Sequence, residues 1–298
     1  MGWTSDDIPD LAGRRAIVTG ANSGIGYHAA LQLARHGASV VLACRSPERG
    51  ETALKRVRAA APGCDAALAG LDLADLASVR AFAADQTAPL DLLVNNAGVM
   101  ALPHRTTADG FEMQFGTNHL GHFALTGLLL PALLKADAPR VITVSSGAAW
   151  LGRMRFTDLQ SERRYRKWVA YAQSKLANLL FTRELARRVP QVVSAAAHPG
   201  YASTNLQQTG PKMAGSALQD RVAGLGNALI AQPAAAGALP TLYAATSPDV
   251  TTGACYGPRV LQYRGTPSRA PLPPAAKNPA DAARLWEISA DLTGVSYP

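Results

Sequence analysis

The chain of 298 residues has little or none of several features that define common classes of protein. Its three cysteines, Cys44, Cys64 and Cys255, are widely spaced and form no C-x-x-C pattern, so we expect neither a disulfide framework nor a zinc site. Reduced thiols favour a cytoplasmic location. The first 14 residues are acidic where a signal peptide would be basic. The most apolar run, residues 125–134, is far shorter than the roughly 18 residues of a membrane helix, so no membrane span is expected.

Acidic residues are outnumbered by basic ones, 21 against 29, which gives a net charge of +8. Much of the excess lies in one stretch, which contains Arg153, Arg155, Arg163, Arg164, Arg166 and Lys167. Such a stretch is a candidate surface for an acidic partner or a membrane. Because aromatic residues do not alternate regularly with these cations and no nucleic-acid-binding motif accompanies them, we interpret the stretch as a solvated face and expect no nucleic-acid partner.

Short apolar segments alternate with helical patterns along the chain. The predicted strands cover residues 15–19, 39–43, 66–71, 90–94, 140–144, 192–197 and about 253–256. Parallel strands need crossover connections, so this alternation predicts one α/β domain over residues 1–298, a doubly wound parallel sheet (Rossmann fold) of about seven strands with helices on both faces. Residues 201–236 form the one long irregular region. A proline-rich crossing over residues 267–278 leads to a final helix near residues 280–292.

A glycine-rich turn follows the first predicted strand. Residues 20–26 read GANSGIG, and a helical pattern from Tyr27 to His36 comes next. Glycine permits a tight turn and a close approach of the backbone, and a helix N-terminus presents free N–H groups to a phosphate. Glycine-rich turns also arise for steric reasons alone. The position of this one, at the first strand-to-helix turn, favours dinucleotide binding.

Tyr171 and Lys175 stand four residues apart, so a helix would place both side chains on one face. A phenol has an ordinary pKa of about 10, and a fixed cation beside it should lower that pKa towards the range in which it transfers protons. An isolated pair of this kind occurs by chance on many solvated helices. Its significance therefore depends on the other motifs of the chain.

Six motifs, taken in order, resemble those of the short-chain dehydrogenase/reductase family: Thr19–Gly26 (TGANSGIG), Asn95–Gly98 (NNAG), Asn118, Val144–Ser146 (VSS), Tyr171–Lys175 (YAQSK) and Pro199–Gly200. The resemblance covers nearly the whole chain. Residues 111–123 and 42–45 are similar to the retinol dehydrogenase-like branch of that family. No single motif is specific, but the ordered set is highly specific.

The resemblance implies a catalytic set of Ser146, Tyr171, Lys175 and Asn118. Hydride transfer to a carbonyl develops negative charge on its oxygen, so the site must supply a proton and hydrogen-bond donors there. Tyr171 would transfer the proton, Lys175 would lower the pKa of the phenol and hold the nicotinamide ribose, and Ser146 would polarise the substrate oxygen. Asn118 would anchor a water that relays protons. Ser145 stays open as the alternative to Ser146.

The resemblance also implies the residues that contact the cofactor. They are Gly20, Asn22, Ser23, Gly24, Ile25, Gly26, Arg45, Asp72, Leu73, Asn95, Ala97, Gly98, Tyr171, Lys175, Pro199, Gly200 and Thr204. An acidic residue after the second strand usually selects NAD, whereas Arg45 can pair with the 2′-phosphate of NADP(H) or, alternatively, cap the following loop. Asp72 resembles a residue that contacts the adenine amine, or it caps the helix that begins near Asp75. The NNAG segment has the alternative role of stabilising the sheet.

Together the motifs predict an NADP(H)-dependent oxidoreductase that acts on an apolar alcohol or carbonyl compound. The alternative is a redox sensor that binds dinucleotide without turnover, although such proteins usually lose the tyrosine or the lysine. A sugar-nucleotide epimerase ranks last, because its glycine loop would read G-x-x-G-x-x-G. Residues 151–169 and 201–236 are expected to wall the substrate pocket. Helices over residues 112–135 and 168–188 are expected to pair with their copies, in a dimer or tetramer, through Leu128, Ala177, Leu179 and Leu180.

Overall fold

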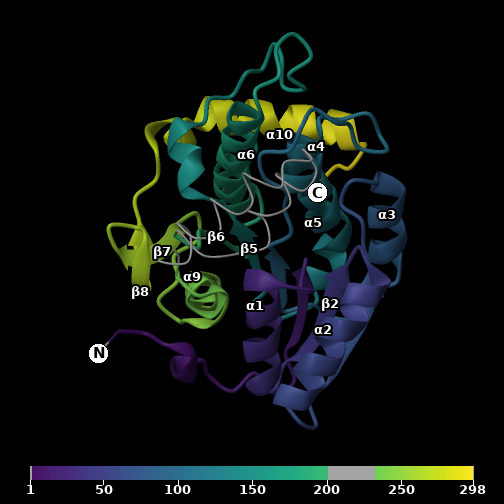
Figure 1. Ribbon diagram of the computed structural model, residues 1–298, viewed down its shortest axis with the longest axis vertical. Helices are drawn as coiled ribbons and strands as arrows, with labels where there is room; N and C mark the ends of the chain where they lie inside the picture. The colour runs from purple at the N-terminus through teal and green to yellow at the C-terminus, as the bar shows by residue number, and fades with distance from the viewer. Residues whose placement is uncertain (1, 201–231, 298) are drawn as a thin grey trace, which may run out of the picture.

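The computed structural model describes residues 2–200 and 232–297 (Figure 1). At its centre is an eight-stranded sheet in the order β3-β2-β1-β4-β5-β6-β7-β8. The strands are β1 (Arg15–Thr19), β2 (Ser39–Cys44), β3 (Ala66–Gly70), β4 (Leu92–Asn95), β5 (Arg140–Val144), β6 (Val193–Ala197), β7 (Cys255–Val260) and β8 (Arg264–Ala270). All neighbours pair in parallel except β7 and β8, which are antiparallel.

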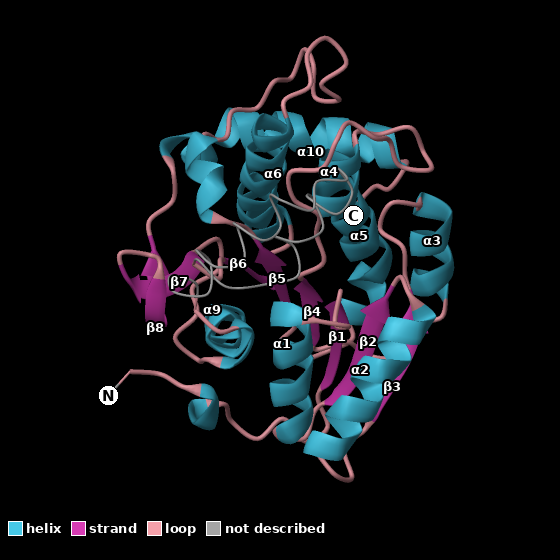
Figure 2. Cartoon of the chain, in the orientation of Figure 1, coloured by secondary structure: helices cyan, strands magenta, loops and turns pink. Residues whose placement is uncertain are grey.

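Helices cover both faces of this sheet (Figure 2). The longer ones are α1 (Gly24–Arg35), α2 (Pro47–Ala60), α3 (Leu76–Ala84), α5 (Gly121–Leu133), α6 (Lys167–Arg188), α9 (Ala234–Thr246) and α10 (Pro279–Thr293). The short ones are η1 (Ser5–Asp7), α4 (Met113–Phe115), η2 (Gly116–Leu120), η3 (Gly147–Leu151) and η4 (Pro274–Lys277). α1, α2 and α9 pack over one face, and α3, α5 and α6 pack over the other, with α10 against α6 and α5 as an outer layer.

Burial of the central strands explains this layering. In β1 and β5 every residue after the first is buried, and β4 is buried throughout. Strands that are apolar on both sides need a covering layer on each face, which crossover helices provide. The prediction of a doubly wound α/β sheet is therefore confirmed.

The sequence predicted about seven strands, and the structure has eight. The missed strand is β8, in the region where residues 267–278 were predicted to be a proline-rich crossing. Pro267 lies inside β8, opposite Pro258 of β7. Proline cannot donate a hydrogen bond to a sheet, so it argues against a central strand, but β8 is an edge strand and tolerates it. Most of the region predicted to be irregular, residues 201–236, lies outside the described residues; α9 begins within it, at Ala234.

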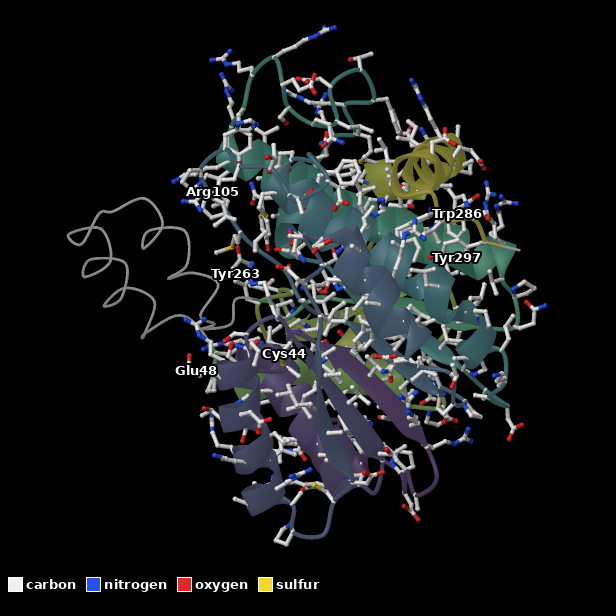
Figure 3. The ribbon with its side chains drawn as sticks, turned by 90° about the vertical axis from the view of Figure 1, so that its right-hand side faces the viewer. Cys44, Glu48, Arg105, Tyr263, Trp286 and Tyr297 are labelled. Atoms are coloured by element: carbon white, nitrogen blue, oxygen red, sulfur yellow. The ribbon has the colours of Figure 1, made fainter. Side chains whose placement is uncertain are left out.

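Two pairs of labelled side chains lie on opposite sides of the molecule (Figure 3). The rings of Trp286 and Tyr297, whose centroids are 4.4 Å apart, lie on one side. Cys44, at the carboxyl end of β2, and Tyr263, in the turn between β7 and β8, lie on the other. Among the described residues no helix combines the length and the apolar character that a membrane crossing requires.

Candidate active site

The predicted site residues follow the carboxyl ends of four strands that lie side by side, β1, β4, β5 and β6. Gly20 follows β1, the NNAG motif begins with the last residue of β4, Ser145 follows β5, and His198 precedes Pro199 after β6. The backbone N–H of Ser145 donates to the carbonyl of Ala197 at 2.8 Å, which holds two of these loops together. In open parallel sheets, ligands bind at this edge.

The glycine loop leaves the start of α1 open to an anion. Gly20 and Gly24 have φ angles of 66° and 56°, in the left-handed region that favours glycine. Ser23 precedes the helix in an extended conformation, and its side chain makes no capping hydrogen bond. The first N–H groups of α1 therefore have no side-chain acceptor among the described residues, which fits the pyrophosphate of a dinucleotide. α1 begins at Gly24 rather than at Tyr27, because the end of the motif itself forms the first turn.

Two other residues that are predicted to contact the cofactor can do so only through their backbone atoms. Ile25 and Leu73 have their side chains in the core, 6% and 5% exposed.

The backbone N–H groups of Ala21 and Asn22 point to the thiol of Cys44, and burial raises the pKa of that thiol to about 11. Cys44 is thus a neutral packing residue beneath the loop.

Thr19 and Asn96 organise the glycine loop, and neither belongs to the predicted set of site residues. The Thr19 hydroxyl accepts hydrogen bonds from the backbone N–H groups of Asn96 and Ala97, both at 2.9 Å. The Asn96 amide donates to the Thr19 carbonyl at 2.7 Å. A Cβ at Gly26 would lie 2.4 Å from the Asn96 amide nitrogen, so only glycine fits there. The position of both residues within the motifs, beside the glycines, was the available signal.

Tyr171 and Lys175 lie on α6 and are 7% and 5% exposed. The Lys175 ammonium donates to the carbonyl of Val144 at 3.1 Å and lies 5.9 Å from the centroid of the Tyr171 ring. Burial raises the pKa of Tyr171 above its ordinary value, and the nearby Ser146 hydroxyl offsets this only in part. The expected lowering by Lys175 is not found in the chain alone, and this expectation is corrected. Burial lowers the pKa of Lys175 itself to about 8, so most of it stays protonated at pH 7.

The structure distinguishes the two serines after β5. Ser145 is 2% exposed, and its hydroxyl donates to the carbonyl of Lys175 at 2.8 Å. Ser146 is half-buried, and its hydroxyl accepts from the backbone N–H of Ala148 at 3.2 Å and lowers the pKa of Tyr171. Of the two hydroxyls, only that of Ser146 lies near enough to the phenol to lower its pKa, which favours Ser146 over Ser145 for contact with a substrate.

Asn118 lies in η2, a single turn of π-helix between α4 and α5. Such turns often mark functional sites. Its side-chain oxygen accepts from the Val99 N–H at 2.7 Å, and its amide donates to the Val99 carbonyl and to the Ser174 hydroxyl, both at 2.9 Å. A Cβ at Gly98 would lie 3.0 Å from this oxygen and 3.4 Å from the Lys175 ammonium. The Asn118 side chain therefore ties the loop after β4 to α6.

His122 extends this network to the glycine loop. Its Nδ1 lies 3.0 Å from the Asn118 carbonyl, which can only accept, so Nδ1 carries the proton. Nε2 then accepts from the Thr19 hydroxyl at 3.0 Å. Burial lowers the pKa of His122 to about 4 and that of His119 to about 3, so both are neutral. Their interpretation as packed, hydrogen-bonded residues agrees with these contacts. Among the described residues, no group of three or more metal-ligating side chains comes together.

The side chains of Asn95 and Asp72 make hydrogen bonds that support the structure around the site. The Asn95 amide is 1% exposed and donates to the Thr126 hydroxyl of α5 at 2.9 Å, which fits the alternative of sheet support. One carboxylate oxygen of Asp72 accepts from the Ala74 N–H at 3.0 Å. The helix cap of α3 is Asp75, which accepts from Ala77 and Ser78, so the alternative that Asp72 caps this helix is wrong.

Arg45 is exposed at the end of β2 and makes no side-chain hydrogen bond among the described residues. The cap of α2 is the Ser46 hydroxyl, which accepts from the Arg49 N–H at 3.4 Å. The alternative that Arg45 caps this loop therefore finds no support. Its guanidinium is free to bind a phosphate.

Pro199 and Gly200 lie against the turn between β7 and β8. Gly200 has a φ angle of 64°, and a Cβ there would lie 2.3 Å from the Tyr263 carbonyl oxygen. Gln262 accepts from His198 at 3.0 Å and so holds the turn to the end of β6. Thr204, the last predicted cofactor residue, lies outside the described residues.

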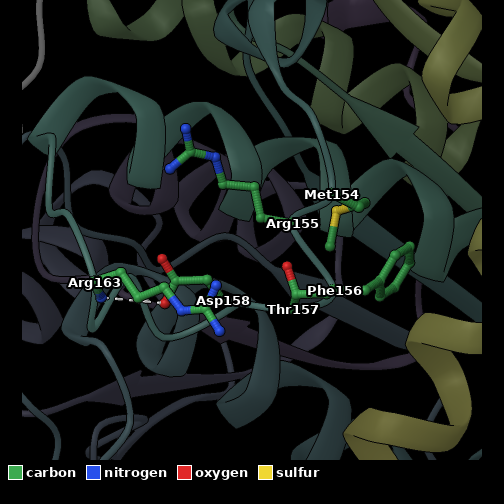
Figure 4. A pocket seen from close by; sticks show the side chains of 6 residues that line it. All are labelled: Met154, Arg155, Phe156, Thr157, Asp158 and Arg163. Carbon is green, nitrogen blue, oxygen red and sulfur yellow. Dashed lines mark hydrogen bonds between the residues drawn. The ribbon is translucent and has the colours of Figure 1, made fainter.

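A hollow of about 420 Å³ lies in the loop after η3 (Figure 4). It is lined by Met154, Arg155, Phe156, Thr157, Asp158 and Arg163. None of the predicted catalytic or cofactor residues lines it, and the guanidinium of Arg284 lies over the Phe156 ring at 4.4 Å. We therefore do not assign the substrate site to this hollow.

Comparison with known proteins identifies the family. The pattern of the short chain dehydrogenase family matches residues 14–214. Retinol dehydrogenase 13 of Homo sapiens is 43% identical over 296 residues, 97% of this chain and 87% of the relative. Retinol dehydrogenase 14 of Mus musculus is 42% identical over 303 residues, 96% of this chain and 87% of the relative.

Solved structures agree. A crystal structure of an uncharacterized protein from Mycobacterium paratuberculosis is 44% identical, with a TM-score of 0.84 and full coverage (100%) of both chains. A Beutenbergia cavernae protein assigned as an NAD(P) dependent gluconate 5-dehydrogenase, with NADP at low occupancy, is 28% identical with a TM-score of 0.63, over 80% of this chain and 91% of that one. The chain belongs to the short-chain dehydrogenase family of oxidoreductases. Within this family it is retinol dehydrogenase-like.

Proposed function

We propose that the protein transfers a hydride between NADP(H) and an apolar alcohol or carbonyl compound. The observation that carries this proposal is the buried phenol of Tyr171, whose pKa the nearby Ser146 hydroxyl lowers and which lies one helical turn before Lys175. A buried phenol with a positioned hydroxyl beside it, at the ligand-binding edge of the sheet, is suited to proton transfer. Bound NADPH would supply the hydride.

Each residue has a chemical task in this proposal. In the direction of reduction, Tyr171 donates its proton to the carbonyl oxygen as that oxygen gains charge. The Ser146 hydroxyl donates a hydrogen bond to the same oxygen and stabilises the developing charge. The Lys175 ammonium, most of it protonated at pH 7, would bind the nicotinamide ribose. Asn118 holds the loop after β4 and, through the second lone pair of its oxygen, can accept from a relay water.

A screen of aldehydes, ketones, sterols and retinoids, followed by the absorbance of NADPH, tests the proposed function. We expect NADPH oxidation with at least one apolar carbonyl compound, and NADP reduction with the corresponding alcohol. A protein that binds NADPH tightly but turns over no compound of these classes would instead support the redox sensor. Retention of both Tyr171 and Lys175 argues against that alternative.

Arg45 supports the choice of NADP(H). Replacing Arg45 with alanine should raise the Kd of NADPH about 10–100-fold, because a charge-assisted hydrogen bond to a phosphate contributes about 1.5–3 kcal/mol. The Kd of NADH should change little, since NADH has no 2′-phosphate. Titration of both dinucleotides measures this, with Lys55→Ala as a control that removes an exposed cation of α2. Equal losses for the two cofactors would leave the cofactor preference open.

The expected dimer cannot form through the predicted side chains. Ala177, Leu179 and Leu180 are at most 3% exposed within the single chain, Leu128 packs against the core, and α10 covers α5 and α6. The prediction of these contacts is wrong, because the apolar faces of both helices are already buried. The edge of the sheet at β8 is the alternative contact surface that we propose.

Light scattering at micromolar concentration tests the homo-oligomer. We expect a mass that is an integer multiple of 31.2 kDa. A charge at the edge of β8, for example Ser268→Lys, should then return the protein to a monomer, because like charges would meet across a twofold contact. A wild-type mass near that of one chain would reject the oligomer.

The cytoplasmic location also stays a proposal, based on the three free cysteines.

A further inference from the structure

The basic stretch found in the sequence forms an exposed surface that the proposed chemistry does not use. Its six cations, Arg153, Arg155, Arg163, Arg164, Arg166 and Lys167, are all exposed. None of them forms an ion pair among the described residues. With Asp158 and Glu162 as its acidic residues, the basic loop (residues 152–167) carries six positive and two negative charges, a net charge of +4.

Large apolar side chains lie at both ends of the basic loop. Trp150 and Leu151, just before it, are 52% and 84% exposed, and Trp168, just after it, is 55% exposed. The sequence favours a solvated face for this stretch on the ground that aromatic residues do not alternate regularly with its cations. Two aromatic residues, Phe156 and Tyr165, do lie within the loop and are half-buried, whereas the exposed aromatic residues, Trp150 and Trp168, flank the charges, which weakens that interpretation. Exposing two tryptophans and a leucine to water is unfavourable unless a partner covers them.

Contacts with α6 bring the two ends of the loop together. A Cβ at Gly152, the residue after Leu151, would lie 2.6 Å from the carbonyl oxygen of Ala172. The Arg155 N–H donates to the Gln173 side chain at 3.0 Å. Both contacts lie about one helical turn from Trp168, so the apolar residues at the two ends surround the first turns of α6. Figure 1 shows the loop projecting past α6 and α10 at the top of the view.

The start of α6 adds to the positive potential. Its N-cap residue is Arg166, which makes no capping hydrogen bond, and its first turn contains no acidic residue. The positive end of the helix dipole is therefore not compensated locally by a carboxylate. The surface combines a field that attracts anions with apolar side chains at its edges.

We propose that the basic loop, together with Trp150, Leu151 and Trp168, docks on the anionic face of a lipid bilayer. Arginine and lysine are attracted to acidic headgroups, tryptophan favours the headgroup region, and a leucine can enter the acyl boundary. Nucleic acid would satisfy the cations equally, but it offers no apolar region for Leu151. A projecting loop also suits a flat surface, because it reaches the surface without a complementary groove.

Docking would bring the bilayer next to the candidate active site. The Trp168 ring lies 6.2 Å from the Tyr171 ring, between centroids. An apolar substrate dissolved in the membrane could then pass from the lipid directly into the nearby active site. The docking itself does not depend on the proposed activity, and vesicle binding tests it without any substrate.

Cosedimentation with vesicles tests the proposal. We expect the purified full chain to bind vesicles of phosphatidylcholine mixed with phosphatidylglycerol and not vesicles of phosphatidylcholine alone. The variant Arg153→Glu/Arg163→Glu/Arg164→Glu should bind at least about 100-fold more weakly. The control Lys55→Glu/Arg269→Glu/Lys277→Glu removes the same charge from exposed positions on three other elements and should lose far less. High salt should release the wild-type protein, because it screens the charges.

Tryptophan fluorescence separates docking from attraction by charge alone. Of the four tryptophans, Trp286 is buried and Trp3 is half-buried, so Trp150 and Trp168 should account for most of a blue shift on anionic vesicles. The variant Trp150→Phe/Trp168→Phe should lose the shift. Equal weakening in the two charge variants, an unshifted spectrum, or equal binding to neutral vesicles would overturn the proposal. Tighter binding of the wild type to duplex DNA than to anionic vesicles would make the surface a nucleic-acid surface instead.

Discussion

Replacing Tyr171 with phenylalanine should lower kcat by about 10²–10⁴, the usual contribution of a positioned general acid or base. The ring is 7% exposed and keeps its packing in the variant, so the fold and the binding of NADP(H) should survive. Only the hydroxyl with its transferable proton, and its interaction with the nearby Ser146 hydroxyl, are removed. Turnover of the substrate found in the screen, at saturating concentration, measures the loss.

A second tyrosine provides the control. The Tyr297 hydroxyl donates to the carbonyl of Phe123 at 2.7 Å and lies on the other side of the molecule from Cys44 and Tyr263 (Figure 3). Tyr297→Phe should lower the thermal midpoint by a few degrees through the lost hydrogen bond and leave kcat nearly unchanged. Comparable turnover in Tyr171→Phe and the wild type would remove Tyr171 from the catalytic role.

Much of the fold could be predicted from the sequence because its strands are short, apolar and buried on both faces. β1, β4 and β5 are examples, and each lies within a predicted segment or within one residue of it. β8 could not be predicted, since its central Pro267 is acceptable only at an edge, and the edge position depends on tertiary structure. α10 was predicted as a helix, but its place over α5 and α6 was not, so the dimer contact was assigned to faces that the chain buries itself.

The candidate site also has features that the sequence predicts and features that it does not. Its positions follow from motifs after known strands, so the structure brings Gly20, Ser146 and Tyr171 to one edge of the sheet as expected. The pKa of Tyr171 could not be predicted from the motif. The effect of Lys175 on it depends on burial and on the distance of 5.9 Å between the Lys175 ammonium and the centroid of the Tyr171 ring. The supporting hydrogen bonds of Asn96 and His122 depend on which loops meet in three dimensions, and spacing along the chain does not show that.

The two serines after β5 provide the most discriminating pair of variants. Ser146→Ala should lower kcat by about 10²–10³, the usual cost of losing one donor to a developing oxyanion. Ser145→Ala removes the same group one residue earlier, where the hydroxyl donates to the carbonyl of Lys175. It should cost about 1 kcal/mol of stability and change kcat far less, because that hydroxyl is committed to α6.

Measuring kcat, the Kd of NADPH and the thermal midpoint for both variants separates the two roles. Ser146→Ala should keep its cofactor affinity, and its midpoint should fall slightly, because the lost hydroxyl caps the short helix η3 by accepting from the Ala148 N–H. Ser145→Ala should shift the midpoint downwards. Because the two residues are neighbours of identical chemistry, a general disturbance of the loop would affect both variants alike. A loss of turnover confined to Ser145→Ala would reverse the assignment and make Ser145 the residue that contacts substrate.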